Sequence, residues 1–486
     1  MIDTNGRSGV SLHILGLMLV AAALTYACGG DRVSNLLPPP TPIPTTITGG
    51  GQTDTVGVIL AQPLGLELRD STGKVIVGAT VNFTSIDGPD SLLVSPVNPQ
   101  NFWGVATDVT DAQGRVKVLV KTGTKAGTAR VVIAVPALGF ADTVTFTVKA
   151  GATAKFTISP RDTSIALGTS FTLKAQPTDR YGNPIASAVP TFSATGVTVS
   201  SAGLVTGASA TARARVVVSS QGVSDSTTVS VVPKFPMVIN RNNSLVLINS
   251  DGTGATTLAT TTNFFPMISP SSVAATSSVV YVKDPGSGAA VWVAQPNSVP
   301  RALLPGATGS NGGPRLSPDG AWVYFVRDRQ SIWRVKLDGT GLDSLGSFAW
   351  SRQFPAPTIS PDGGSVAIDD GNTIKIIDVA TKTSRTLPVK CGAPRYSPDG
   401  AFFACVGGLD MSIVRTDGTG LRVVADLMRS DPDDVSGVDW SPDGKWLVTT
   451  TTYDGAVLVE VSSGALIPLA ALGIGFPQVG EASFVR

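Results

Sequence analysis

The 486 residues carry 36 basic and 35 acidic side chains, and charged residues make up only 15% of the chain. No run of Lys or Arg is long enough to follow a phosphate backbone, so a nucleic-acid partner is not expected. At roughly 150 residues per domain, the length predicts about three domains. The 53 Gly and 34 Pro, with abundant Val, Thr and Ser, favour short strands and many turns, so the predicted fold class is all-β.

Histidine is the most informative residue count. The sole histidine, His13, lies in an N-terminal apolar segment that export would remove, so the mature protein would contain none. This excludes Ser-His-Asp and Cys-His catalysis and His-ligated metal sites, because each needs an imidazole near its neutral pKa. Chemistry based on carboxylates, tyrosine or lysine stays open. We expect no catalytic residue, no metal site and no cofactor.

Residues 1–27 have the pattern of a signal peptide, because the apolar stretch at 10–24 is too short for a membrane span and has the length of a signal h-region. Residues 24–30 resemble the lipobox of bacterial lipoproteins, in which a small residue, here Ala27, precedes a cysteine, here Cys28, that is diacylated. The resemblance implies an N-terminal lipid anchor in a membrane of the cell envelope. An ordinary signal peptide cut after Ala27 and an uncleaved anchor are the alternatives, and both also place the chain outside the cytoplasm.

Residues 28–53 are predicted to form a tether. The prolines at 38–40, 42 and 44 favour an extended polyproline II conformation, and the glycines at 49–51 restore flexibility. Such a segment would hold the following domains away from a membrane.

Two β-sandwiches are predicted next, over residues 54–150 and 151–233. In the first, apolar residues alternate in short runs such as Val116, Val118 and Val120. This is the period of half-buried strands, and turn residues separate the runs. A β-sandwich accounts for the pattern.

Several motifs in these two domains resemble bacterial Ig-like domains. In the first domain they are Leu-Glu-Leu-Arg-Asp-Ser-Thr-Gly at 66–73, Gly-Ala-Thr-Val-Asn-Phe at 78–83 and Thr-Asp-Ala-Gln-Gly at 110–114, which look like the stalk domains of intimin and invasin. In the second, Asp-Arg-Tyr-Gly-Asn-Pro at 179–184 and Ser-Ala-Gly-Leu-Val-Thr-Gly at 201–207 resemble a second bacterial Ig-like group. The resemblance implies immunoglobulin-like sandwiches that act as spacers, because these motifs are turns and strand cores.

A tetrapeptide repeat dominates residues 234–486. Four copies of Ser-Pro-Asp-Gly and one partial copy are spaced by 48, 43, 37 and 44 residues, which suits one four-stranded propeller blade per repeat. In such a turn Pro fixes φ, Asp accepts backbone N–H bonds and Gly takes the left-handed region, so these acids are expected to be structural and not catalytic. The copies begin at Ser269 (partial), Ser317, Ser360, Ser397 and Ser441, and the turn residues are Asp319, Gly320, Asp362, Gly363, Asp399, Gly400, Asp443 and Gly444.

These turns, the apolar strands after them and three Asp-Gly-Thr-Gly hairpin turns resemble the WD40-like repeats of the TolB propeller. The resemblance implies a β-propeller that binds protein partners. Five turns and a partial repeat near Phe235 predict six blades, and residues 478–486 are predicted to supply the strand that completes a split sixth blade. The expected architecture is therefore two Ig-like sandwiches followed by a six-bladed propeller.

Cys391 and Cys405 flank one of the turns. Antiparallel pairing around Pro398 would bring residue 391 nearly opposite 405 to 408, and an oxidising compartment would favour a disulfide. The alternative is that Cys405 is a core residue, because it occupies the position of Phe325 in its repeat.

Two acidic clusters are further candidate sites, Asp369 with Asp370 and residues 431–434. Either could gather oxygen ligands for calcium or act on a sugar, but neither has a recognisable loop spacing, and solvated loop acids are the simpler interpretation.

Three functions remain open at this point. The first is a non-catalytic binding or scaffold protein of the cell envelope, facing the periplasm or exposed at the surface, in which the Ig-like domains space a propeller that engages a protein, peptide or glycan. The second is a surface adhesin or stalk protein with the propeller at its tip. The third is a carboxylate-dependent enzyme acting on glycans, which would need two acids converging in one pocket.

Overall fold

The computed structural model describes residues 43–97, 101–241, 244–260, 268–283, 290–306, 309–348, 356–371, 373–407, 410–427, 437–451, 455–474 and 482–486. Within these ranges the regular elements are β-strands and short 3-10 turns, so the predicted all-β class is confirmed. The part of the chain described contains no helix of the length and apolarity that a membrane crossing requires. The chain forms two compact units, the first ending at Val148 and the second beginning at Lys149.

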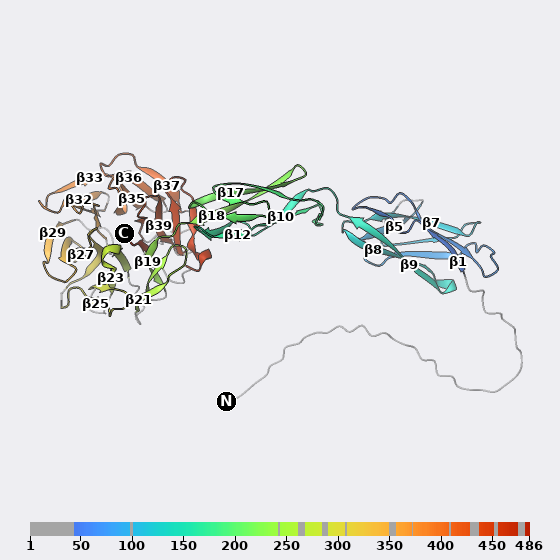
Figure 1. Ribbon diagram of the computed structural model, residues 1–486, viewed down its shortest axis with the longest axis horizontal. Coiled ribbons are helices and arrows are strands. Elements are labelled where there is room, and N and C mark those ends of the chain that lie inside the picture. Colours follow the sequence, from blue (N-terminus) through green and yellow to red (C-terminus); the bar gives the residue numbers. More distant parts are fainter. Residues whose placement is uncertain are drawn as a thin grey trace, which may run out of the picture. The chain divides into compact units, whose positions relative to one another are not determined.

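The first unit is a β-sandwich of a four-stranded sheet, in the order β1-β3-β7-β5, and a five-stranded sheet, in the order β2-β9-β8-β4-β6 (Figure 1). Alternate side chains of β7 and β8 point into one apolar core between the sheets, as the period of two predicts. The strands are β1 (Ile43–Thr48), β2 (Thr53–Thr55), β3 (Leu64–Arg69), β4 (Thr80–Ser85), β5 (Leu92–Pro96), β6 (Val105–Val109), β7 (Arg115–Thr122), β8 (Gly127–Val135) and β9 (Phe140–Lys149), with the 3-10 turn η1 (Pro136–Leu138).

This sandwich begins earlier in the chain than residue 54. Strand β1 pairs antiparallel with β3, Ile43 opposite Arg69 and Thr48 opposite Gly65. The end of the segment predicted as a tether is therefore an edge strand. Its register shifts between Pro44 and Thr46, which fits the rule that proline, lacking an N–H, is tolerated at sheet edges and bulges.

Two of the turn motifs that resemble Ig-like domains are held by an aspartate. Asp70 Oδ1 accepts hydrogen bonds from the backbone N–H groups of Thr72 and Lys74, at 2.9 and 3.0 Å. Asp179, in the second sandwich, is buried and accepts three backbone N–H bonds, including one from Gly151 N at 2.9 Å, and a fourth bond from the Asn183 side-chain amide. These acids satisfy turn backbone, which is a structural task.

The second sandwich has the sheets β10-β13, β12-β16-β15 and β11-β18-β17-β14 around a separate apolar core. Two of its residues, Ala212 and Val232, instead belong to an apolar cluster of the propeller that includes Leu469 and Phe484. The strands are β10 (Lys155–Ser159), β11 (Thr163–Ala166), β12 (Ser170–Thr172), β13 (Lys174–Thr178), β14 (Thr191–Thr195), β15 (Thr198–Val199), β16 (Leu204–Thr206), β17 (Thr211–Ser220) and β18 (Val223–Val232).

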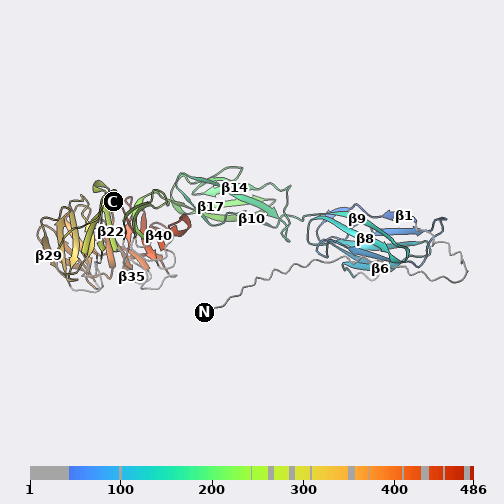
Figure 2. The same cartoon turned by 90° about the horizontal axis from the view of Figure 1, so that it is seen from below.

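Six four-stranded sheets form a closed propeller, as predicted (Figures 1 and 2). Blades 1 to 5 are β22–β25, β26–β29, β30–β33, β34–β37 and β38–β41, and blade 6 is β42 with β19–β21. Their bounds are β19 (Pro236–Arg241), β20 (Ser244–Asn249), β21 (Thr256–Thr260), β22 (Ile268–Val273), β23 (Ser278–Lys283), β24 (Ala290–Ala294), β25 (Arg301–Ala302), β26 (Asn311–Leu316), β27 (Trp322–Arg327), β28 (Ser331–Lys336), β29 (Asp343–Ser347), β30 (Thr358–Ile359), β31 (Ser365–Asp369), β32 (Ile374–Asp378), β33 (Ser384–Leu387), β34 (Gly392–Tyr396), β35 (Phe402–Gly407), β36 (Asp410–Arg415), β37 (Arg422–Asp426), β38 (Asp439–Trp440), β39 (Trp446–Thr451), β40 (Gly455–Glu460), β41 (Leu466–Pro468) and β42 (Ala482–Phe484), with the 3-10 turns η2 (Ala274–Thr276) and η4 (Leu469–Leu472).

Each Ser-Pro-Asp-Gly turn connects the innermost strand of a blade to the next strand. In all four, the Ser hydroxyl donates to the Asp Oδ1 at 2.5 to 2.6 Å and the Gly N–H donates to the Ser carbonyl at 2.8 to 3.0 Å. Gly320 shows why glycine ends the turn, since its φ is +69° and a Cβ there would lie 2.4 Å from Thr276 Cγ2. The Ser317 hydrogen bond lowers the pKa of Asp319, and Asp362 and Asp399 have lowered pKa values for the same reason.

The ring is closed by the last residues of the sequence. Strand β42 pairs antiparallel with β19, Phe484 opposite Met237, and the next residues reach blade 1 through a hydrogen bond from Ala274 N to Arg486 O at 2.6 Å. The Phe484 side chain is fully buried and packs edge-on against Phe235 with 5.8 Å between ring centroids. Closure therefore pairs the edge of β19 that would otherwise be open.

Deleting residues 478–486 should destabilise the propeller strongly. The deletion removes the β42 ladder and the Phe484 side chain, whose loss alone is worth about 3–5 kcal/mol at a buried site. Urea unfolding followed by tryptophan fluorescence measures the effect. The control is Phe484→Leu, which keeps the strand and should cost far less, and an unfolding midpoint unchanged by the deletion would contradict the role given to β42.

Candidate functional site

A cavity of about 280 Å³ lies at the centre of the ring of blades. The innermost strand of every blade contributes to its lining, and Arg486 at the C-terminal end, which Figure 1 places near the centre of the ring, also lines it. The centre of a closed barrel or propeller is a common place for a ligand to bind. This cavity is therefore the candidate site.

One polar residue from each blade stands at the same level of the cavity wall. Each is opposite the third residue of the neighbouring strand of its own blade, as Arg315 is opposite Tyr324 and Asp439 opposite Val448. We call these six residues the channel ring. In blade order they are Ser271, Arg315, Thr358, Arg395, Asp439 and Ser483.

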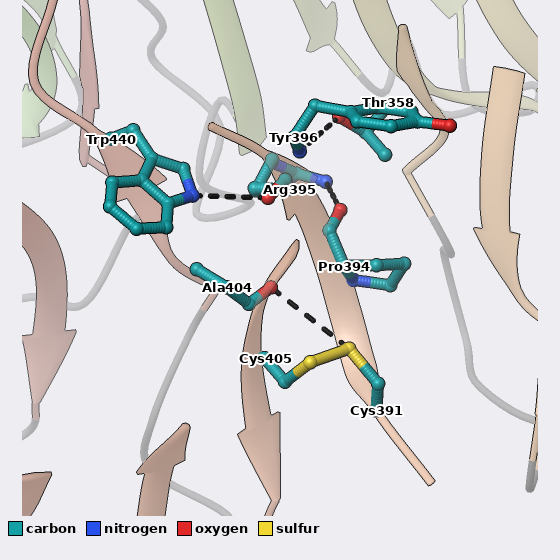
Figure 3. Close-up of a disulfide and its surroundings, with 8 residues drawn as sticks. All are labelled: Thr358, Cys391, Pro394, Arg395, Tyr396, Ala404, Cys405 and Trp440. Atoms are coloured by element: carbon teal, nitrogen blue, oxygen red, sulfur yellow. Dashed lines mark hydrogen bonds between the residues drawn. A yellow bond between two sulfur atoms is a disulfide. The ribbon is translucent and has the colours of Figure 1, made fainter. Parts of the chain in front are cut away.

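The channel ring joins neighbouring blades in pairs. A side-chain oxygen in an odd-numbered blade accepts a backbone N–H from the next blade, as Thr358 Oγ1 does from Tyr396 N at 3.0 Å (Figure 3). The equivalent bond in blades 1 and 2 runs from Leu316 N to Ser271 Oγ at 3.2 Å. In blades 5 and 6 it runs from Phe484 N to Asp439 Oδ2 at 3.0 Å.

Asp439 is the acidic member of the channel ring and holds blade 6 in place. Its Oδ2 also accepts the Ser483 hydroxyl at 2.7 Å, and its Oδ1 accepts Arg486 Nη2 at 2.5 Å. Burial alone would raise the pKa of this carboxyl, but the charges of Arg486 and Arg395 outweigh it and hold the pKa below its usual value. Asp439 is therefore ionised at neutral pH.

Arg315 and Arg395 are the buried cations of the channel ring, 8% and 3% exposed. Arg315 Nη1 donates to Pro270 O in the preceding blade at 3.4 Å, and Arg395 Nη1 donates to Ala356 O at 3.2 Å. Each guanidinium group therefore links its own blade to the one before it.

The mouth of the cavity is bordered by prolines of the repeated turns. Three of them are exposed and Pro398 is half-buried. We call this set the proline rim, and it consists of Pro318, Pro361, Pro398 and Pro442. The repeat thus supplies both the blade turn and an apolar border to the cavity.

A disulfide joins Cys391 and Cys405 in blade 4 (Figure 3). Their Cα atoms are 4.9 Å apart, and Gly392 lies opposite Val406 in the β34–β35 ladder. Both cysteines are also buried in an apolar cluster.

Asp369 and Asp370 are not among the residues that line this cavity. Asp369 and Asp370 lie at the end of β31, where Asp369 Oδ1 accepts the Gly371 N–H at 2.9 Å. Cys28 and the acidic cluster at 431–434 lie outside the described residues. No group of three or more His, Cys, Asp or Glu side chains within the described ranges could hold a metal ion.

Sequence reasoning missed the channel ring, although a signal for four of its members is present. The residue two positions before each Ser-Pro-Asp-Gly serine is in turn Arg315, Thr358, Arg395 and Asp439. These positions vary while the turn repeats. A variable polar position beside a constant turn is the signal that could have been used.

No family model matches the chain. An uncharacterized protein of Agrobacterium fabrum is 33% identical over 119 residues, which cover 20% of this chain and 40% of that protein, so the chain spans less than half of that curated relative.

Solved structures were also compared. TolB from Acinetobacter baumannii is 15% identical, covers 60% of this chain and 82% of its own, and has a TM-score of 0.43. A nidogen/laminin complex chain is 12% identical, with 52% and 98% covered and a TM-score of 0.43. A protein described as TolB from Agrobacterium tumefaciens is 16% identical, with 49% and 88% covered and a TM-score of 0.37.

The Asp439→Asn variant should lower the free energy of unfolding of the propeller by about 3 kcal/mol, because it leaves a partly buried Arg486 without its carboxylate. The wild-type carboxyl has a lowered pKa in the folded state, so its contribution is complete above its unfolded pKa of about 3.9 and is lost as the pH falls through the folded value. The difference in the free energy of unfolding between wild type and variant should therefore become smaller below about pH 4. Urea unfolding at several pH values measures this.

The matched control is Asp426→Asn, at an exposed position at the end of β37. It should change the free energy of unfolding by less than about 0.5 kcal/mol. An Asp439→Asn variant as stable as this control would contradict the role assigned to Asp439.

Proposed function

We propose that this chain is an exported, non-catalytic binding protein of the cell envelope, whose propeller engages a segment of another protein in the central cavity. The observation that carries the proposal is the cavity itself, with a polar channel ring inside an apolar proline rim. Ligand pockets typically combine such an apolar wall with a few convergent polar groups. The periplasm-facing or surface-exposed side of an envelope membrane is the location that fits a signal sequence and a disulfide.

Binding is favoured over catalysis by the chemistry of the lining. Asp439 is the one carboxylate among the side chains described along the cavity wall. Its oxygens accept bonds from Ser483, Phe484 and Arg486, so it serves to hold blade 6. Glycoside hydrolysis needs two acids on either side of the scissile bond, and this wall supplies one.

The two sandwiches are proposed to be Ig-like spacers. Each has its own closed apolar core, and their polar turn residues Asp70 and Asp179 are engaged with turn backbone. In this proposal they hold the propeller away from a membrane in which a lipid on Cys28 is anchored. The rest of residues 28–42 would be the tether.

Replacement of Cys28 tests the anchor. Cys28→Ser should move the protein from the membrane pellet to the soluble fraction of disrupted cells, because the proposed acylation needs the cysteine thiol. Incorporation of labelled palmitate is the second measurement, and it should be lost in the variant. A variant that stays in the pellet, or a wild type without label, would show that Cys28 carries no lipid.

Photocrosslinking in intact cells tests the binding site. A photoreactive phenylalanine derivative at Pro361, exposed on the proline rim, should crosslink to one discrete protein partner identified by mass spectrometry. The control position is Val299, which is 90% exposed and lies outside this cavity, and it should give none of that product. Equal products from both positions, or none from Pro361, would refute binding at the cavity.

A further inference from the structure

The second sandwich is joined to the propeller by a short, fixed connection. Strand β18 ends at Val232 and β19 begins at Pro236, so three residues lie between the two domains. Ser250 in blade 6 is fully buried, and its hydroxyl donates to Pro233 O and accepts the Phe235 N–H at 3.0 Å. Such a connection lacks the freedom of a flexible linker.

An apolar cluster continues from the second sandwich into the propeller. We call the cluster that contains Ala212, Val232, Leu469 and Phe484 the junction cluster. Val232 lies on the opposite face of β18 from Val231, because side chains alternate along a strand, and Val231 belongs to the sandwich's own core. The last turn of β18 therefore packs on both domains. Removing this apolar surface from water favours contact between them.

Blade 5 carries an extension that belongs to the junction cluster. After its outermost strand β41 the chain forms the 3-10 turn η4, in which Leu469 is fully buried. A turn of blade 6 packs on this extension, since a Cβ at Gly252 would lie 2.5 Å from Leu472 O. Strand β40 of blade 5 also contacts β17 of the second sandwich. The sandwich therefore contacts blade 5 and continues directly into blade 6.

The junction cluster includes the strand pair that closes the ring. Blade 6 is the split blade, in which β42 pairs with β19. Strand β19 follows the sandwich in sequence, and Phe484 of β42 shares the junction cluster with Val232. Phe484 also lines the central cavity. Packing of the sandwich on this cluster therefore stabilises the closed ring and one wall of the cavity.

We propose that the second sandwich is a brace for the split blade, and that it unfolds together with the propeller as one cooperative unit. The compact unit Lys149–Arg486 contains both domains. The first sandwich unfolds separately, because its buried core is a cluster of its own that runs from Val56 to Val148. The second sandwich thus does more than set a distance from a membrane, and this role is independent of what the cavity binds.

Matched core substitutions in the full chain test the coupling. Val218→Ala removes buried methyl groups from the core of the second sandwich, and Val118→Ala does the same in the first, both at positions that are 0% exposed. Trp103 is the only one of the seven tryptophans outside residues 234–486, so thermal unfolding followed by tryptophan fluorescence reports on the propeller. Val218→Ala should lower the unfolding temperature of the propeller by about 2–5 °C, and Val118→Ala should leave it unchanged.

Hydrogen exchange followed by mass spectrometry shows which domain each substitution destabilises. Val218→Ala should speed exchange in both the second sandwich and the propeller, whereas Val118→Ala should speed it in the first sandwich alone. Faster exchange confined to the second sandwich in Val218→Ala, with an unchanged unfolding temperature of the propeller, would overturn the coupling. An equal shift of that temperature by both variants would also overturn it.

A second matched pair tests the brace at the split blade. Val232→Ala and Val231→Ala remove the same atoms from adjacent residues of β18, the first from the junction cluster and the second from the sandwich core. Under native conditions the amides of β42 should exchange about tenfold faster in Val232→Ala than in Val231→Ala, because only the first loosens the packing around Phe484. Equal exchange of these amides in the two variants would show that the sandwich does not brace the closing strand.

Discussion

The hydrogen bonds of Asp439 connect the stability of the propeller to its candidate site. This carboxylate belongs to the innermost strand of blade 5, yet its partners Ser483, Phe484 and Arg486 all belong to the last five residues of the sequence. A buried carboxylate is costly unless it is paired and hydrogen-bonded, and these partners meet both needs. The residue that holds the closing strand is thus also the acidic member of the channel ring.

The propeller could be predicted because its turns repeat a sequence with a clear physical reason. Ser-Pro-Asp-Gly combines a fixed φ, a backbone acceptor and a left-handed residue, and each copy precedes an apolar strand. The spacing predicted the blades, and the leftover strand at the end predicted the split sixth blade. Both predictions agree with the order β42-β19-β20-β21.

The sequence marks four members of the channel ring by their place before each turn, but it does not show that all six residues form one site. Arg315, Thr358, Arg395 and Asp439 are unlike in chemistry, and only the equal register of the six inner strands brings them to one level. Strand β1 was also not predicted. Pro44 indicates an extended tether, and only its pairing with β3 shows that an extended segment can also be a sheet edge.

The split sixth blade also affects how the chain folds. Met237 and Phe484 are paired in space but lie near opposite ends of the propeller sequence. Strand β19 therefore cannot pair with β42 until almost the whole propeller has been synthesised. Contacts between residues so distant in sequence slow folding, because a long loop must be closed before they are gained. During synthesis the edge of β19 stays open until β42 has been made. The vulnerable moment of this protein is therefore the interval between the emergence of β19 and that of β42, when a chaperone would find an unpaired strand to protect.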